Sequence, residues 1–150
     1  MRLLLIILIL FGFSFAKTIP DFKLLDENRK VVKRDDLKGK PSVLIFWGLY
    51  CGSCKKELPI IEKYYERYKN KINFYAIVLE SENSKDVEEI KKAWGFNIPV
   101  LLNGKKIMYK YKIFGVPISY FVDKDLKVKK ILIGKVPEEK IKKEIENLLK

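Results

Sequence analysis

The apolar residues of this chain are concentrated in short continuous runs and in segments where they recur every three or four positions. Such runs occupy residues 43–47 and 74–79, a third at 118–122 is interrupted only by Ser119, and residues 128–133 follow it after a polar turn at 123–125. Short apolar runs bounded by turn signals are typical of buried β-strands. The pattern therefore predicts three core strands, the last of which continues through a hairpin into a partner strand.

Three other segments carry apolar residues at helical spacing, at residues 55–69, 84–94 and 137–149. Ser84 is expected to cap the second helix, because its hydroxyl can accept a free backbone N–H. Gly95 is expected to end that helix. Strands that alternate with helices and then give way to a hairpin and a last helix predict an α/β layered fold with a central mixed sheet.

Shorter signals complete the expected order of elements. Residues 22–25 and 31–33 flank a polar turn and predict a β-hairpin ahead of the first core strand. Residues 100–102 predict a short strand, and residues 105–111 predict a short helix.

The first residues have the composition of a targeting segment. Arg2 supplies a positive charge, residues 3–15 are nearly all apolar, and small residues allow cleavage after Ala16. The apolar run is shorter than the about 20 residues of a spanning helix, which favours a cleaved signal peptide at 1–16 over an uncleaved membrane anchor. Residues 17–150 are then expected to form one domain. Both alternatives place it outside the cytoplasm, where disulfides persist.

The chain is strongly basic, with 31 basic and 19 acidic residues, a formal net charge of +12 and no histidine. Such a charge suits acidic partners or anionic lipid headgroups. Nucleic acid is not expected as a partner, because the chain has no nucleic-acid-binding motif and its domain is expected outside the cytoplasm.

Cys51 and Cys54 are the only cysteines, and they lie where the strand at 43–47 meets the helix at 55–69. At a helix N-terminus the free N–H groups and the helix dipole favour a thiolate, which is the nucleophile of disulfide exchange. A purely structural disulfide across so short a loop would restrict the unfolded chain little. The spacing therefore predicts a redox-active pair, in which Cys51 attacks and Cys54 resolves the mixed disulfide.

A metal site is the other chemistry that two cysteines allow. Tetrahedral zinc takes four ligands, and the chain has no histidine to add to the two thiols. Neither a metal nor any cofactor besides the redox-active disulfide is expected. A Cu(I)-binding thiol module is the alternative from another class.

Four motifs make the chain resemble the thioredoxin superfamily, and within it the TlpA/ResA-like disulfide oxidoreductases. They are Phe46-Trp47 ahead of the cysteines, the run Cys-x-x-Glu-x-Pro that begins at Cys54, Gly115-Val116-Pro117 before a strand, and a hairpin that ends at residues 37–40. The resemblance covers about residues 19–149. It implies a thioredoxin-like fold whose central mixed sheet is flanked by helices and preceded by an N-terminal β-hairpin extension.

The resemblance also implies roles for residues around the cysteines. Pro117 is expected to follow a cis peptide bond and to leave the backbone of Val116 free to pair with an extended substrate. Trp47 and Tyr50 are expected to pack around the cysteines and to complete the substrate-binding surface. Tyr50 stands where the family usually has tryptophan.

The sequence indicates the proton acceptor of the site less clearly than it indicates the cysteines. Ile45 stands where cytoplasmic thioredoxins carry a buried aspartate. TlpA/ResA-like proteins place a glutamate at the end of the strand after the active-site helix, and Glu80 falls at that point. Glu80 is therefore expected to be a partly buried carboxylate that exchanges protons with the cysteines. A solvated loop acid is the alternative.

Together these features predict an extracytoplasmic thiol–disulfide oxidoreductase that works mainly as a reductant. The dipeptide between the cysteines lacks the histidine of strong oxidants, so the thiolate is less stabilised and the disulfide is less oxidising. The resemblance implies disulfide-containing proteins as substrates, apocytochrome c among them, and a DsbD/CcdA-type membrane protein as electron donor. A general disulfide oxidant or isomerase is the alternative among enzymes.

Overall fold

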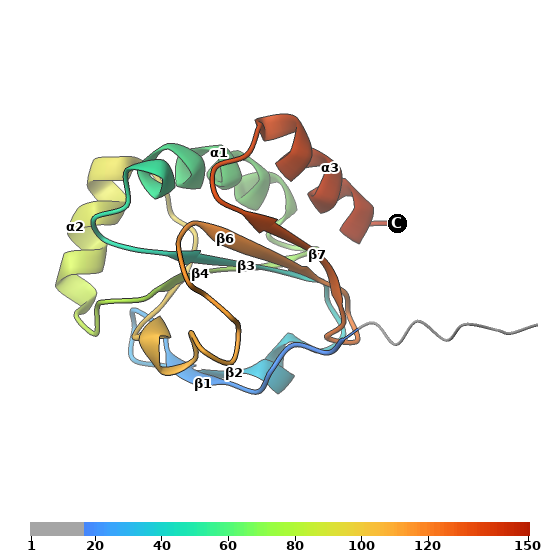
Figure 1. Cartoon of the computed structure of the whole chain (residues 1–150), viewed down its shortest axis with the longest axis horizontal. Coiled ribbons are helices and arrows are strands. Elements are labelled where there is room, and N and C mark those ends of the chain that lie inside the picture. The colour runs from blue at the N-terminus through green and yellow to red at the C-terminus, as the bar shows by residue number, and fades with distance from the viewer. Residues whose placement is uncertain (1–16) are drawn as a thin grey trace, which may run out of the picture.

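The computed structural model describes residues 17–150, and the targeting segment predicted at 1–16 lies outside the described residues. A five-stranded sheet forms the centre of the domain, with helices on one face and a small hairpin on the other (Figure 1). Its strands are β3 (Ser42–Trp47), β4 (Asn73–Val78), β5 (Val100–Leu101), β6 (Ile118–Val122) and β7 (Val128–Ile133), in the spatial order β5-β4-β3-β6-β7. β3, β4 and β5 are parallel, while β6 pairs antiparallel with both β3 and β7. The predicted mixed sheet is confirmed.

The central strand β3 divides the core into two layers. All of its residues are buried, and successive side chains of a strand point to opposite faces. Val43, Ile45 and Trp47 belong to the cluster under the helices, whereas Leu44 and Phe46 belong to the cluster under the hairpin. Burial on both faces explains why this segment is a continuous apolar run rather than an alternating one.

Three helices cover one face of the sheet: α1 (Gly52–Tyr68), α2 (Ser84–Trp94) and α3 (Glu138–Leu148). Each buries apolar side chains against this face, such as Leu58 of α1, Val87 of α2 and Ile145 of α3. None of the helices within residues 17–150 is long and apolar enough to cross a membrane.

The other face is covered by the predicted hairpin and by the segment before β6. β1 (Lys23–Leu25) pairs antiparallel with β2 (Val31–Lys33) in a separate sheet, and the short 3₁₀ helix η1 (Arg34–Leu37) leads on to β3. Tyr111, in the segment before β6, links the sheet to the chain ahead of the hairpin. Its ring packs on Phe46 of β3, and its hydroxyl donates to the carbonyl of Pro20 at 2.8 Å.

Two helix starts differ from the prediction because other residues provide the caps. α1 begins at Gly52 rather than at residue 55, with Cys51 in the N-cap position. Asn83, not Ser84, caps α2, and its side-chain oxygen accepts the N–H of Lys85 at 2.9 Å. A side-chain amide is as good a cap as a hydroxyl, so the neighbouring polar residues made this boundary ambiguous.

The helix predicted at residues 105–111 is wrong. The structure has only the 3₁₀ helix η2 (Gly104–Lys106), followed by turns. Ile107 and Tyr111 are both buried and four residues apart, which mimics a helical stripe. The N–H of Tyr111 donates to the carbonyl of Ile107 at 3.1 Å, so the two side chains share one helical turn that does not continue as a helix.

Candidate active site

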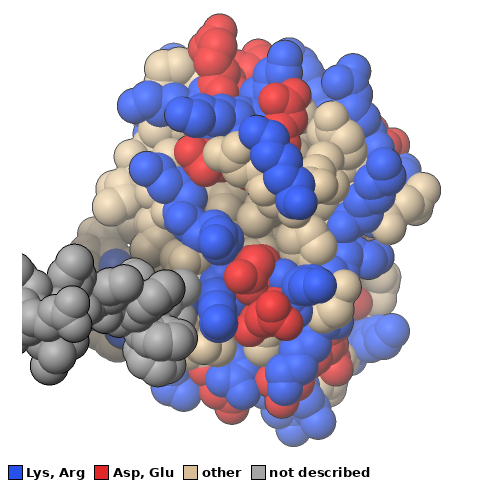
Figure 2. Space-filling view, turned by 90° about the vertical axis from the view of Figure 1, so that its right-hand side faces the viewer, with Lys and Arg blue, Asp and Glu red and all other residues tan. Residues whose placement is uncertain are grey.

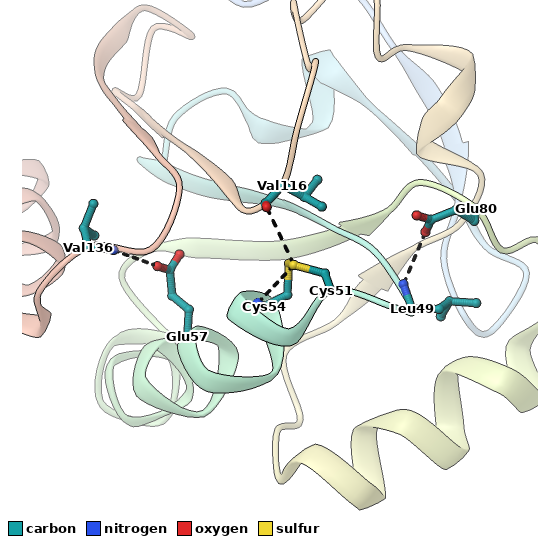
Figure 3. Close-up of a disulfide and its surroundings, with 7 residues drawn as sticks. All are labelled: Leu49, Cys51, Cys54, Glu57, Glu80, Val116 and Val136. Atoms are coloured by element: carbon teal, nitrogen blue, oxygen red, sulfur yellow. Dashed lines mark hydrogen bonds between the residues drawn. A yellow bond between two sulfur atoms is a disulfide. The ribbon is translucent and has the colours of Figure 1, made fainter.

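Cys51 and Cys54 lie where β3 passes into α1, at one end of the sheet, and they form a disulfide (Figure 3). Cys51 is partly exposed, whereas Cys54 is fully buried in the first turn of the helix. Only the sulfur of Cys51 can therefore react with a sulfur of another protein.

The local backbone favours negative charge on the exposed sulfur. As the N-cap residue, Cys51 accepts the N–H of Cys54 at its Sγ atom, with 3.1 Å between nitrogen and sulfur. The first turn of α1 carries no acidic residue. In the reduced protein, the same N–H and the helix dipole would stabilise a Cys51 thiolate.

Val116 and Pro117 are brought to the disulfide from 65 residues along the chain. The carbonyl oxygen of Val116 lies 3.7 Å from Sγ of Cys51, and the Val116–Pro117 peptide bond is cis. β6 starts directly after this segment and pairs with β3, with Ile118 opposite Phe46. This pairing places the backbone of Val116 beside the exposed sulfur.

Trp47 and Tyr50 are placed very differently by the turn between them. The Trp47 side chain is fully buried and packs edge-on against Trp94 and Phe96, at centroid distances of 5.5 and 5.6 Å. The expectation that Trp47 is part of the substrate-binding surface is corrected accordingly, because a buried ring supports the turn and cannot touch another protein. Tyr50, in contrast, is 94% exposed next to Cys51.

The expected partial burial of Glu80 is wrong, because this side chain is exposed. Its carboxylate accepts the N–H of Leu49 at 3.3 Å and points to that turn rather than to the sulfurs (Figure 3). A Cβ atom on Gly48 would lie only 2.6 Å from Oε1 of Glu80, so the glycine lets the carboxylate approach the backbone. Glu80 thus stabilises the turn that leads into Cys51.

A buried carboxylate does lie on α1: it is Glu57, the glutamate of the Cys-x-x-Glu-x-Pro run, to which the sequence alone assigned no role. Glu57 is only 3% exposed, and its carboxylate accepts the N–H of Val136 at 3.4 Å. The pKa of Glu57 is raised from 4.5 to about 7, because burial disfavours the carboxylate form. The hydrogen bond from Val136 and the charge of Lys135 offset only part of this rise. Residues three apart on a helix are neighbours, so Glu57 lies one turn beyond Cys54 on the same buried face.

A signal for Glu57 was present in the sequence. It lies three residues after Cys54 and four before Ile61, in the middle of the apolar stripe of α1. A charged residue in such a stripe either turns out to solvent or is buried with a shifted pKa, and only the tertiary structure shows which.

Two depressions flank Cys51. One, of about 390 Å³, is apolar and is lined by residues that include Phe114, Val116, Pro117 and Ile133. Phe114 and Ile133 are 79% and 75% exposed, which is unusual for large apolar side chains. The other is open and polar, and its lining includes Tyr50, the acids Glu80, Glu82 and Asp86, and the bases Arg29 and Lys85. Within residues 17–150, no group of three or more His, Cys, Asp and Glu side chains is arranged to hold a metal ion.

The placement of Glu80 leads to a first prediction. Glu80→Gln should keep the hydrogen bond to Leu49, because the amide oxygen still accepts, and should lower the rate of disulfide exchange by less than tenfold. Loss of a general acid–base group lowers the reaction rate by a factor of about 10² to 10⁴. Stopped-flow reduction of a model disulfide measures the rate, and a fall of a hundredfold or more would assign proton transfer to Glu80 after all.

Comparisons with known proteins agree with this geometry. The AhpC/TSA family model matches residues 15–131. The thiol-disulfide oxidoreductase ResA of Bacillus thuringiensis strain Al Hakam is 35% identical over 139 residues, which cover 91% of this chain and 78% of that protein. ResA of Bacillus subtilis strain 168 is 32% identical over 129 residues, which cover 85% of this chain and 72% of that protein.

Comparison with solved structures identifies the fold. A thiol:disulfide interchange protein of the thioredoxin family from Chlorobium tepidum TLS superposes with a TM-score of 0.77, covering 90% of this chain and 97% of the other. Because its sequence is only 19% identical, this likeness shows the thioredoxin-like fold alone. The predicted fold class is thereby confirmed, with the β1–β2 hairpin as an addition at the N-terminal side.

Proposed function

We propose that this chain, which belongs to the AhpC/TSA family and within it to the ResA-like thiol–disulfide oxidoreductases, reduces disulfide bonds of other proteins outside the cytoplasm. One observation carries the proposal: a partly exposed Cys51 at the start of α1, paired with a buried Cys54, beside the backbone of Val116. This arrangement has one sulfur for attack and one for resolution.

In the proposed cycle the reduced protein starts with a Cys51 thiolate and a Cys54 thiol. The thiolate attacks one sulfur of a substrate disulfide, forms a mixed disulfide and releases the first substrate sulfur as a thiolate. Cys54 then loses its proton and attacks Sγ of Cys51, which breaks the mixed disulfide and releases the second substrate sulfur. The substrate gains two electrons, and the Cys51–Cys54 disulfide seen in the structure is formed.

We assign the proton of Cys54 to Glu57. Cys54 is fully buried, and burial disfavours a thiolate unless a nearby group takes the proton. Glu57 is the buried acid on the same helix, and its pKa of about 7 lets it hold or release a proton near neutral pH. Glu80 keeps its part as the acceptor that holds the Leu49–Cys51 turn.

The surface around Cys51 supports a protein as substrate. The backbone of Val116, beside Cys51, suits pairing with an extended segment, and the depression at Phe114 and Ile133 suits an apolar side chain next to the substrate cysteine. We infer apocytochrome c as a candidate substrate and a DsbD/CcdA-type membrane protein as the electron donor, on the basis of the kinship with ResA. We infer a location outside the cytoplasm, secreted, periplasmic or anchored on the outer face of the membrane, which the same kinship and the apolar residues 3–15 support.

The reduction potential of the Cys51–Cys54 pair tests the direction of electron flow. We expect a value near or below the roughly −270 mV of thioredoxin, because no histidine between the cysteines stabilises the thiolate form. Equilibration with a glutathione or dithiothreitol buffer, read by mass spectrometry after alkylation, measures it. A value near the roughly −120 mV of DsbA would make the protein an oxidant. Tight stoichiometric Cu(I) binding without turnover would instead indicate a copper module.

The apolar depression gives a further prediction. Phe114→Ser should raise KM for a protein disulfide by about tenfold, because one exposed aromatic anchor is worth roughly 1–2 kcal/mol at an interface. Turnover of a small disulfide such as hydroxyethyl disulfide should not change. Tyr109→Ser is the matched control, because Tyr109 is also an exposed aromatic, at 76%, but does not line this depression. Equal effects of both variants on KM would remove the depression from the substrate-binding surface.

A further inference from the structure

The end of the sheet opposite the disulfide is where the described chain enters the fold. The carbonyl of Lys17 accepts the N–H of Val128, the first residue of β7, at 2.9 Å, and the N–H of Ile19 donates to Leu126 at 2.9 Å. β3 runs from this end toward Cys51 over six residues, which is about 20 Å of strand. The entry point and the redox pair therefore lie at opposite ends of the domain.

This opposite end is strongly basic. We call it the basic end and define it by six lysines that lie on the chain entry, the start of β3, the approach to β4, and the β6–β7 turn with the first part of β7: Lys17, Lys40, Lys71, Lys124, Lys127 and Lys129. Figure 2 looks at this side of the molecule, where Lys and Arg side chains surround a small acidic group.

The segments of the basic end are held together by backbone contacts. Ser42 at the start of β3 pairs with Asn73 on one side and Val122 on the other. The N–H of Gly39 donates to the carbonyl of Lys124 at 2.9 Å. These backbone contacts place the six lysines at the same end of the sheet.

The positive charge of the basic end is not neutralised within the domain. Within residues 17–150, none of its six lysines lies within 4.0 Å of a carboxylate, in contrast to Lys91 and Lys92 of α2, which form ion pairs at 2.7 and 2.8 Å. Asp123 and Asp125 are the acids of the β6–β7 turn, and the Asp123 carboxylate is used by backbone N–H groups of that turn. The turn and the first part of β7 hold three lysines and two aspartates, and Lys17, Lys40 and Lys71 add positive charge from the neighbouring segments.

We propose that the basic end rests on the surface of an anionic phospholipid membrane. A general principle and one feature of the chain select this partner. Lysines near a membrane surface are attracted by anionic headgroups within a Debye length. In addition, in the alternative where the apolar residues 3–15 stay as a membrane anchor, they join the domain through Lys17, within the basic end itself. Docking in this way turns Cys51 and both flanking depressions away from the lipid, so that protein substrates reach them from the aqueous side.

Lysine footprinting of the full chain tests the proposal. The protein is mixed with preformed phosphatidylcholine vesicles, with or without phosphatidylglycerol, and exposed to a membrane-impermeant amine reagent. Mass spectrometry then follows each lysine. We expect Lys124, Lys127 and Lys129 to react at least about threefold more slowly with phosphatidylglycerol present, and high salt to remove the difference. Lys85, Lys105 and Lys106, near the opposite end, should react equally with both vesicles.

Charge variants separate the basic end from the net charge of the whole chain. Replacing Lys124, Lys127 and Lys129 together by glutamine should abolish the phosphatidylglycerol-dependent protection that remains at Lys17 and Lys71. The matched control replaces Lys85, Lys105 and Lys106 by glutamine and should leave that protection unchanged.

Four outcomes would overturn the proposal: equal rates with both vesicles, equal protection at both ends, protection that survives high salt, or a loss of protection that is the same in both triple variants. Protection by soluble polyglutamate but not by vesicles would also overturn it and would assign the end to an acidic protein. The measurement does not involve disulfide exchange, so its result is independent of the proposed oxidoreductase cycle.

Discussion

Cys54→Ser should trap protein substrates as mixed disulfides through Cys51, with no measurable multiple turnover. Cys51 is the partly exposed sulfur and keeps the N–H of residue 54 as its hydrogen-bond donor, so attack survives the substitution. Resolution needs the second thiol and is lost. The reduced variant is incubated with a disulfide-containing protein, and non-reducing mass spectrometry measures the covalent adduct.

Cys51→Ser is the matched control for this trap. It leaves one thiol, but Cys54 is fully buried and cannot meet a substrate sulfur without opening the first turn of α1. We expect few adducts and no turnover. Equal trapping by the two variants would contradict the division of roles between Cys51 and Cys54.

Glu57→Gln should have the second-largest effect. Glutamine keeps the shape of the side chain and can still accept the N–H of Val136, but it cannot take the proton of Cys54. We expect the resolving step to slow by about a hundredfold, at the lower end of the range for losing a general acid–base group. In the unchanged protein this step should accelerate as pH rises through about 7, because the carboxylate form then becomes populated. Rapid quenching of a preformed mixed disulfide across pH measures both effects.

The same substitution should change how stability depends on pH. In the oxidised protein the cysteines do not titrate, and the pKa of Glu57 is raised from 4.5 to about 7 by burial. Between these values the folded state holds a proton that the unfolded state has lost, so the free energy of unfolding falls as pH rises. The fall attributable to Glu57 is roughly 3 kcal/mol and is complete above about pH 7. Urea unfolding of the oxidised Glu57→Gln variant should lack this fall.

Glu66→Gln is the control for both measurements, because Glu66 is an exposed acid of the same helix. It should leave the resolving step and the pH dependence of stability almost unchanged. If Glu57→Gln behaves like Glu66→Gln in the kinetic measurement, the proton of Cys54 goes to water.

The sequence determined the sheet and the identity of the redox pair. β3 is buried on both faces, so it had to be an unbroken apolar run, and such runs can be recognised without knowing what covers them. Cys51 and Cys54 were equally clear, because the strand-to-helix turn and the spacing of the motif are both local features. The hairpin of β1 and β2 was recognisable for the same reason, from its turn residues.

Local patterns failed where a side chain serves a distant part of the fold. Ile107 and Tyr111 have helical spacing and share one hydrogen-bonded turn, but the chain does not continue from that turn as a helix, and both side chains pack into the core under the hairpin. Trp47 and Tyr50 are three residues apart near the cysteines, yet the turn between them buries one ring and exposes the other. The sequence shows which side chains are apolar, but it does not show which direction a turn gives them.

The two glutamates show most clearly what only the tertiary structure decided. Glu80 was expected to end a core strand and to be partly buried, but β4 stops at Val78 and the Glu80 side chain is exposed beside the Leu49 turn. Glu57 lies in an ordinary amphipathic helix, and it is buried because Val136, 79 residues away, closes over it and donates a hydrogen bond. The pKa of a carboxyl group depends on the solvent that surrounding segments exclude. That exclusion is a property of the packed domain, so which of the two glutamates is buried was decided by contacts between residues far apart in the chain.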